Sequence, residues 1–252
     1  MRYKSRWKAP RATTTARAMR ARYLVIGDLH GATDRLSAVV ENAAAEPIDG
    51  VFLVGDFAAF DGRRYHHEPE TVQEELARCL KILAPLQVEW LWVPGNHDPR
   101  GLAGPGNCDR RLTRAGDLSV YGVGGSGPHA FGFPYEWHDD EIDDLVIGNV
   151  DVLLSHTPPL GTLDLTRSGI HAGSQSIRRH ALRSARVVLC GHIHEAAGVA
   201  RLGNALVLNP GSLGLPFGAL QYGELLADES GLTVLQRNLS LARVSKLSSG
   251  AE

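Results

Sequence analysis

The segment Arg22-Tyr-Leu-Val-Ile-Gly-Asp-Leu-His-Gly31 carries the pattern that decides the fold. Its apolar run, Tyr23 to Ile26, ends at a glycine, and Asp28 and His30 follow directly. A short continuous apolar run that ends in glycine is typical of a strand buried on both faces of a parallel sheet. Open α/β sheets bind ligands at the carboxyl ends of such strands. This segment therefore predicts a buried strand that delivers an aspartate and a histidine to a ligand site.

The same arrangement repeats outward along the chain. Residues 34–46 and 69–83 show apolar side chains at helical spacing, and residues 50–55 and 88–93 are strand-like, so βαβ units and a mostly parallel sheet are expected. In the second half, helices are expected only at 138–147 and 174–185. Strands are expected there at 118–123, 150–155, 186–191, 199–208, 222–227 and 232–237. The whole pattern predicts an α/β fold, a four-layer α/β/β/α sandwich of two mixed β-sheets flanked by helices.

Composition excludes several classes of protein. The 252 residues are 43% hydrophobic and 21% charged, which excludes a disordered chain, a collagen-like repeat and a coiled coil. No apolar run reaches the ~18–20 residues that a membrane-spanning helix needs. Three scattered cysteines do not form a disulfide framework or a CxxC metal site. We therefore expect a cytoplasmic protein with no membrane partner.

Charge divides the chain into a basic end and an acidic body. Residues 1–22 hold eight basic side chains and no acidic one, which leaves 18 basic and 28 acidic residues for the remainder. An acidic body repels polyanions, so a nucleic-acid polymer is not an expected partner, whereas a homo-oligomer remains open. We expect a disordered basic extension at 1–21, a single domain at 22–240 and a flexible C-terminal tail at 241–252. The stretch 99–116 is expected to be a surface loop.

Polar side chains follow five of the predicted strands. After Asp28 and His30 come Gly55-Asp56, Gly95-Asn96-His97-Asp98, His156 and Gly191-His192-Ile193-His194. Imidazole and carboxylate ligands without thiolate suit Mn, Fe, Ni, Co or Zn. Seven donors are too many for one ion with open positions and instead suit two ions roughly 3.5–4 Å apart that share one carboxylate. The pattern therefore predicts a site for two divalent ions at the carboxyl ends of these strands.

In order and spacing, these motifs resemble the calcineurin-like metallophosphoesterase superfamily, with its D-x-H, G-D, G-N-H-[DE], single H and G-H-x-H blocks. The resemblance covers roughly Arg22 to Arg237. Residues 155–161 and the pair His194-Glu195 further resemble a small-phosphodiesterase branch related to the metallophosphoesterase-domain proteins. The resemblance implies the metallophosphoesterase fold and hydrolysis of a phosphoester by water activated between two divalent ions, with Mn²⁺ expected and Fe, Zn, Ni or Co as alternatives.

The resemblance also implies roles for individual residues. One ion is assigned to Asp28, His30, Asp56 and His194, and the other to Asp56, Asn96, His156 and His192, so that Asp56 bridges. The catalytic residues implied are the ligand Asn96 and His97, which is not a ligand but lies near the leaving-group oxygen as proton donor or cationic stabiliser. Asp98 is a candidate to orient His97. In some family members the partner acid stands three residues after the bridging aspartate, where this chain has Ala59.

Other residues allow two interpretations. Arg167 and His171 are candidate substrate contacts, or else solvated loop residues. Tyr135 and Trp137 form either an interface or a lid over the substrate, and the pair His66-His67 is expected to be exposed. We expect a small phosphodiester as substrate, a cyclic nucleotide or an aryl diester. A phosphomonoesterase or protein phosphatase, in which Arg63, Arg64 and Arg100 would clamp a phosphate, and a non-catalytic scaffold of the same fold remain alternatives.

Overall fold

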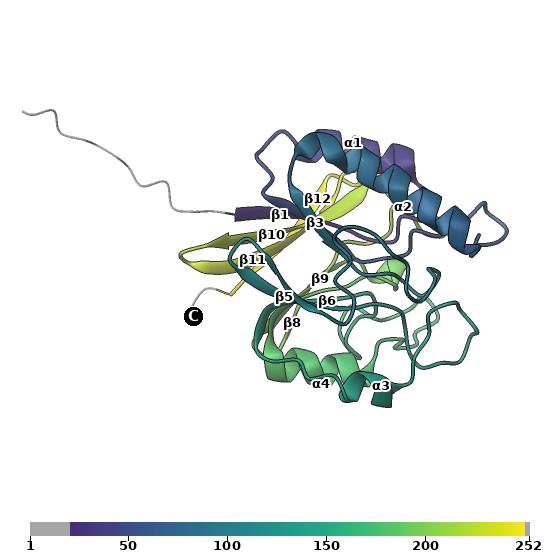
Figure 1. Ribbon diagram of the computed structural model, residues 1–252. Helices are drawn as coiled ribbons and strands as arrows, with labels where there is room; N and C mark the ends of the chain where they lie inside the picture. The colour runs from purple at the N-terminus through teal and green to yellow at the C-terminus, as the bar shows by residue number, and fades with distance from the viewer. Residues whose placement is uncertain (1–20, 250–252) are drawn as a thin grey trace, which may run out of the picture.

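The computed structural model describes residues 21–249 (Figure 1). The basic extension predicted for residues 1–21 lies outside this range, apart from Ala21, which begins the first strand. Within the described range, no helix combines the length and the apolar character that crossing a bilayer requires.

Within residues 21–249, twelve strands form two six-stranded mixed sheets. The first sheet has the order β12 (Arg243–Ser248), β11 (Gly231–Asn238), β10 (Gln221–Asp228), β1 (Ala21–Ile26), β2 (Gly50–Leu53) and β3 (Glu89–Trp92). The second has the order β4 (Leu112–Ala115), β5 (Leu118–Val123), β6 (Val150–Ser155), β7 (Ala185–Leu189), β9 (Ala205–Asn209) and β8 (Gly198–Leu202). Parallel pairing joins β1, β2 and β3 in the first sheet and β5, β6, β7 and β9 in the second. The remaining strands pair in antiparallel: β10, β11 and β12 in the first sheet, and β4 and β8 in the second.

Helices cover the outer face of each sheet (Figure 1). The helices α1 (Thr33–Ala43) and α2 (Pro69–Leu83) pack on the first sheet, and α3 (Asp139–Asp143) and α4 (Gln175–Ser184) pack on the second. Two short 3₁₀ turns lie at Ala84–Leu86 and His194–Ala196. The predicted four-layer sandwich is therefore confirmed.

Alternation of side chains along each strand produces these layers. In β1, Tyr23 and Val25 enter the core between the two sheets, whereas Leu24 and Ile26 pack against α1 and α2. The second sheet follows the same rule, since Val152 of β6 faces the first sheet and its neighbour Leu153 faces the helices. Successive side chains of a strand point to opposite faces, so a sheet buried on both faces needs an uninterrupted apolar run.

The structure corrects several sequence expectations. The predicted strand 199–208 is a hairpin of β8 and β9, because Gly203, with φ of 57°, turns the chain back. The segment Arg243–Ser248, expected to belong to a flexible tail, is the edge strand β12 paired with β11. The loop expected at 99–116 contains β4, and the helix expected at 138–147 is the five-residue α3.

The turns that follow the parallel strands meet at one edge of the sandwich. The backbone N–H of His30 donates to the carbonyl of Asp56 at 2.9 Å, which joins the turn after β1 to the turn after β2. In the second sheet, the N–H of Gly191 donates to the carbonyl of His156 at 2.9 Å. Each of these bonds joins two turns of one sheet, and the N–H of His192, which donates to Asp28 Oδ1 at 3.0 Å, joins the turns of the two sheets.

Candidate metal centre

Four side chains from three turns form the centre of this polar cluster. The carboxylates of Asp28 and Asp56 and the imidazoles of His30 and His194 place ligand atoms within 4.8 Å of one another. His194 Nε2 lies 3.3 Å from Asp28 Oδ1 and 3.3 Å from His30 Nε2. His30 Nε2 lies 3.4 Å from Asp56 Oδ2. The four donors therefore converge on a single point.

A second group of donors adjoins the first. His156 Nε2 lies 3.5 Å from Asp56 Oδ2, the oxygen that also faces His30. Asn96 Oδ1 lies 2.9 Å from His156 Nε2 and 2.8 Å from His192 Nδ1. The structure thus brings together all seven predicted ligands, and one oxygen of Asp56 lies between the two groups.

Hydrogen bonds from the Nδ1 atoms of three histidines to backbone carbonyls direct the other ring nitrogen, Nε2, toward the cluster. Nδ1 of His30 faces the carbonyl of Ala58 at 3.0 Å, and Nδ1 of His156 faces that of Val54 at 2.6 Å. Nδ1 of His194 faces the carbonyl of Pro216 at 2.8 Å. A carbonyl can only accept, so each Nδ1 carries a proton, and each Nε2 is the ring nitrogen directed at the cluster, where it presents a lone pair once it is deprotonated. Metal-ligating histidines are commonly held by a hydrogen bond of this kind.

Burial makes the cluster electrostatically incomplete without a cation. Burial and then the charge of Asp28 raise the pKa of Asp56 well above its usual value. Burial lowers the pKa of His30 and of His192 to about 3, with neighbouring imidazoles adding to the effect. Although burial disfavours its charged form, His194 beside Asp28 has a pKa raised to about 9. Buried carboxyls form a donor set with imidazoles that are neutral, as in His30 and His192, or that release a proton when metal binds, as in His194. A divalent cation complements such a set.

The side-chain amide of Asn96 also indicates a metal ligand. Among the described residues, its Nδ2 is buried without a hydrogen-bond partner, while its Oδ1 faces two imidazoles. Buried polar groups are rarely left unpaired unless an ion, a water or a functional role explains them. An amide group that points its oxygen into the cluster, while its NH₂ group is left without a hydrogen-bond partner, is suited to ligate a metal. The residues present therefore fit a site for divalent metal ions.

Four of the predicted ligands adopt a strained backbone conformation. The φ angles are 45° for Asp28, 43° for His30, 59° for Asp56 and 68° for His192. For residues other than glycine, this left-handed region costs roughly 1–2 kcal/mol each. Such strain persists where the surroundings demand it and is concentrated at functional sites.

Gly95 allows the third turn to approach the centre. A Cβ built at this position would lie 2.0 Å from Asp56 Oδ1 and 2.4 Å from the Asp56 nitrogen. Any side chain there would displace the carboxylate that both donor groups share. The glycine before Asn96 is thus explained by the close approach of the turns after β2 and β3.

Asp98 has a different role from the one predicted. Its buried carboxylate accepts hydrogen bonds from four backbone N–H groups, which belong to Gly95, Asp56, Phe57 and Ala58, at 2.7–2.9 Å. The prediction that Asp98 orients His97 is therefore wrong, because both of its oxygens are engaged by the backbone. The residue fixes the two turns that carry Asp56 and Asn96.

His97 lies beside the cluster in an aromatic environment. Its ring stacks on Tyr65, with centroids 3.6 Å apart and planes 19° apart, and Phe133 lies 4.5 Å away. Its Nδ1 lies 2.9 Å from Nε2 of His67, a residue that was expected to be merely exposed. Nothing in the sequence around His67 indicates this contact, because the loop between β2 and α2 creates it.

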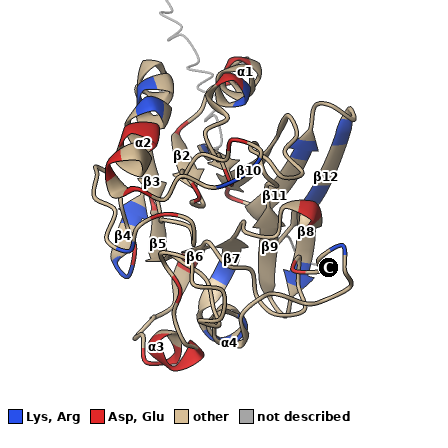
Figure 2. Ribbon diagram, turned by 90° about the vertical axis from the view of Figure 1, so that its right-hand side faces the viewer, with Lys and Arg blue, Asp and Glu red and all other residues tan. Residues whose placement is uncertain are grey.

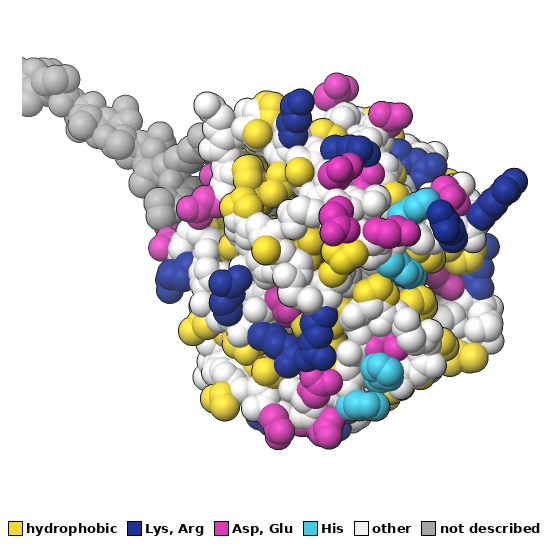
Figure 3. All heavy atoms as spheres, turned by 45° about the vertical axis from the view of Figure 1, so that its right-hand side comes forward, with side chains coloured by type: hydrophobic (Ala, Val, Ile, Leu, Met, Phe, Trp, Pro, Cys, Tyr) yellow, Lys and Arg dark blue, Asp and Glu magenta, His cyan; other side chains and the backbone are white. Residues whose placement is uncertain are grey.

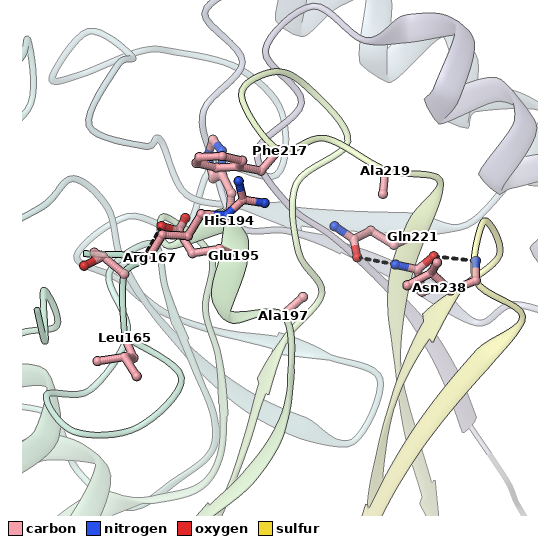
Figure 4. A pocket seen from close by; sticks show the side chains of 11 residues that line it. Leu165, Arg167, His194, Glu195, Ala197, Phe217, Ala219, Gln221 and Asn238 are labelled. Carbon is pink, nitrogen blue, oxygen red and sulfur yellow. Dashed lines mark hydrogen bonds between the residues drawn. The ribbon is translucent and has the colours of Figure 1, made fainter. Parts of the chain in front are cut away.

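A cavity of about 470 Å³ opens beside His194 (Figure 4). Arg167 and Phe217 belong to its lining, and the guanidinium carbon of Arg167 lies 4.0 Å from the centre of the Phe217 ring. His171, predicted together with Arg167, is instead paired with the buried Asp164 at 2.7 Å and does not line this cavity.

Other side chains that the sequence singled out lie outside the centre. Tyr135 and Trp137 are fully buried in the core beneath the second sheet, so they are neither an exposed interface nor a lid. The acidic residues of α3 lie on the outer layer (Figure 2). One of them, Glu141, forms an ion pair with Arg100. Histidine side chains reach the surface at two places on the face drawn in Figure 3. The ligand histidines are buried or nearly so.

Comparisons with known proteins agree with this geometry. A model of the family described as calcineurin-like phosphoesterase matches residues 21–196. Uncharacterized protein MJ1162 of Methanocaldococcus jannaschii is 34% identical over 140 residues, which make up 49% of this chain and 64% of that protein. The chain thus aligns with less than two thirds of that relative.

Two solved structures share the fold. A dimetal phosphatase from Danio rerio has a TM-score of 0.61 at 13% identity, covering 92% of this chain and 99% of its own. The protein TT1561 of Thermus thermophilus has a TM-score of 0.53 at 17% identity, covering 91% and 99%. At these identities the likeness concerns the fold alone.

Proposed function

The chain belongs to the calcineurin-like phosphoesterase family, and we propose that it is a hydrolase that cleaves phosphoesters with two divalent metal ions. The observation that carries the proposal is the position of Asp56. Its Oδ2 lies 3.4 Å from Nε2 of His30 and 3.5 Å from Nε2 of His156, one from each donor group. A carboxylate oxygen shared in this way is what two neighbouring ions require.

Each ion would take one donor group. Asp28, His30, Asp56 and His194 would hold the first, and Asp56, Asn96, His156 and His192 the second. When bound, a pair of divalent ions polarises the phosphoryl group and makes water a nucleophile at neutral pH. We propose Mn²⁺ as the ion, because imidazole, carboxylate and amide ligands suit borderline and hard divalent cations.

His97 is the proposed proton donor to the leaving group. Its backbone N–H donates to Asp56 Oδ1 at 2.9 Å, which ties its position to the shared carboxylate. Its Nδ1 faces His67, so its Nε2, on the opposite edge of the ring, is the nitrogen available to an ester oxygen. Proton donation by a positioned imidazole contributes typically 10²–10⁴-fold to rate.

The cavity beside His194 is the proposed site of the ester group that is retained. Its volume of about 470 Å³ lies within the range of small-molecule sites, about 300–1,000 Å³. In the described part of the chain, no carboxylate forms an ion pair with the Arg167 guanidinium, which lies over Phe217 and can meet an anionic or aromatic group. These features support a small phosphodiester, either a cyclic nucleotide or an aryl diester.

A phosphomonoesterase or protein phosphatase is the second candidate. Of the arginines that could clamp a monoester phosphate, Arg100 pairs with Glu141 at 2.6 Å on the outer surface. Arg63 and Arg64 are exposed in the loop between β2 and α2. This arrangement favours the diester.

The test compares ester classes with the metal identified. The purified protein is loaded with Mn²⁺, its metal content is measured by mass spectrometry, and hydrolysis is followed on bis-p-nitrophenyl phosphate, p-nitrophenyl phosphate and cyclic nucleotides. We expect two ions per chain and diester hydrolysis that exceeds monoester hydrolysis. Asp56→Asn should lose both metal and activity, whereas the exposed Asp61→Asn should keep both. Two bound ions without turnover of any ester would instead identify a non-catalytic scaffold.

Replacement of His97 tests its chemical role. His97→Ala should retain the metal ions, because the ring is not a donor to either group. The variant should lose far more activity on esters with a poor leaving group than on nitrophenyl esters, whose leaving group needs no proton. Equal losses on the two kinds of ester would contradict proton donation.

A further inference from the structure

The polar contact made by the ring of His97 is unusual because its partner is a second histidine. Nε2 of His67 lies 2.9 Å from Nδ1 of His97, and their rings are nearly parallel, with centroids 5.2 Å apart. His67 reaches this position from the loop between β2 and α2, thirty residues away in sequence. The contact is half-buried, so it is protected from solvent without being sealed.

Among the described residues, no carboxylate is hydrogen-bonded to the His97 ring. Asp98, the residue next to His97, gives both of its oxygens to backbone N–H groups. Tyr65 occupies one face of the His97 ring at 3.6 Å and Phe133 lies near it at 4.5 Å. Within residues 21–249, His67 is therefore the side chain that supplies a hydrogen-bonding partner to the His97 ring.

We propose that His67 is the positioning residue of His97, with its Nε2 accepting a hydrogen bond from the Nδ1–H of His97. This inference rests on the proposed function, in which His97 gives a proton from Nε2 to the departing oxygen. The donating ring is the imidazolium, with a proton on each nitrogen, and the bond keeps the Nδ1 proton in place, so the neutral ring left after the transfer has a single tautomer and the same orientation. Nε2 of His97 then loses its proton while the N–H to His67 stays intact.

An imidazole is suited to this role beside a charged substrate. A carboxylate would hold Nδ1 equally well but would add a negative charge close to a phosphoester anion. Neutral His67 supplies the acceptor without that charge. The stack with Tyr65 restricts tilting of the ring, and the bond to His67 restricts its rotation, so the two contacts together define where Nε2 points.

The adjacent histidine provides a matched control. His66 belongs to the same loop and is half-buried to a similar degree, but its Nε2 faces Asp61 Oδ2 at 3.0 Å rather than His97. Replacing His66 removes an imidazole and a local contact of the same loop without touching the His97 ring. A difference between the two variants therefore reports the contact to His97 and not damage to the loop.

The kinetic test uses two aryl diesters with different leaving groups, bis-p-nitrophenyl phosphate and diphenyl phosphate. His67→Ala should lower kcat on diphenyl phosphate by about 10–100-fold, a part of the general-acid contribution, and on the nitrophenyl ester by less than about 3-fold. His67→Gln, which restores an acceptor oxygen, should recover part of the loss, and His66→Ala should leave both rates unchanged. Equal losses on both esters would overturn the proposal.

A double variant and a spectroscopic measurement complete the test. His67→Ala combined with His97→Ala should be no slower than His97→Ala alone, because residues that act as one unit are not additive; additive losses would overturn the positioning role. In ¹⁵N NMR of the metal-free protein, a coupling through the hydrogen bond should join His97 Nδ1 and His67 Nε2, and it should survive His66→Ala. Its absence would overturn the inference, whereas a wild-type protein with this coupling but no esterase activity would refute the proposed function alone.

Discussion

Asp98→Asn changes one atom of a buried side chain, and it tests how the turns of the metal centre are held. The wild-type carboxylate accepts four backbone N–H bonds, two on each oxygen. Oδ1 receives those of Phe57 and Ala58, and Oδ2 receives those of Gly95 and Asp56. Asparagine keeps one acceptor oxygen and places an NH₂ group where the other oxygen stood.

The magnitude follows from the two N–H groups that lose their acceptor. The residue is fully buried, so water does not replace the lost bonds. A buried donor left unpaired costs about 1–3 kcal/mol, which gives roughly 2–6 kcal/mol for two donors. For a domain of this size, each 1 kcal/mol lowers Tm by about 2–4 °C, so the variant should melt roughly 4–24 °C below wild type.

The assay is thermal unfolding of the metal-free protein, together with titration of Mn²⁺. Whichever oxygen is replaced, the lost bonds hold the turn that carries Asp56. Metal affinity should therefore fall by about 10–100-fold, as when other groups that support metal ligands are removed. Asp61→Asn is the control, because Asp61 also accepts two backbone N–H bonds but is exposed. Its Tm should change little, since surface substitutions usually stay within about 0.5 kcal/mol.

An unchanged Tm together with an unchanged Mn²⁺ affinity would refute this role of Asp98. If Asp98→Asn melted within about 2 °C of wild type and bound Mn²⁺ with unchanged affinity, the four N–H bonds would not be what holds these turns. The backbone strain at Asp56 would then need another support.

Three other perturbations have definite expected outcomes. Chelation should abolish hydrolysis and lower Tm, with Mn²⁺ restoring both, because a ligand that binds only the folded state stabilises it; unchanged Tm after verified metal loss would contradict this. Gly95→Ala should fold, by circular dichroism, yet bind less metal, because its Cβ would lie 2.0 Å from Asp56 Oδ1; full metal content would show that the two turns can separate without loss of the site. Arg22→Ala should lower the free energy of unfolding, measured by urea denaturation, by about 1.5–3 kcal/mol, because buried Glu224 loses its hydrogen bond to Arg22 but keeps its ion pair with Arg237. It should spare kcat, since Arg22 lies at the far end of β1 from Asp28.

The sequence was sufficient to predict the layers and the convergence of donors. Strands such as Tyr23 to Ile26 are apolar without interruption, and only a sheet covered on both faces accommodates them. Because parallel strands of one sheet end at the same edge, residues that follow them, such as Asp28 and Asp56 in the first sheet, had to lie near one another. These predictions depend on local pattern and strand direction alone.

Contacts that loops create could not be predicted in this way. Asp98 is next to His97 in sequence, yet its side chain turns to four N–H groups of the neighbouring turns. His67 lies in a segment with no periodicity, and only the folded loop brings it to His97. Pro216, whose carbonyl fixes the proton of His194, carries no sequence signal for that task.

The sequence between β8 and β9 contains a turn signal for the hairpin that these strands form. Gly203 and Asn204 separate β8 from β9, and a two-residue Gly-Asn turn is a recognised hairpin connection. Because the residues on either side of the turn are largely apolar, residues 199–208 resemble one long strand. The edge strand β12 was missed for the opposite reason, because its sequence is polar and exposed and becomes a strand only through pairing with β11.

The donor groups have one further consequence for the chain as a whole. Asp28, Asp56 and Asn96 come from the part that precedes β4, whereas His156 and His192 come from the part that begins with β4. Cutting the polypeptide between these parts would leave two fragments, each with an incomplete set of ligands. The centre could be rebuilt only where the fragments reassociate in the native arrangement, so recovered metal uptake would serve as a readout of complementation between them.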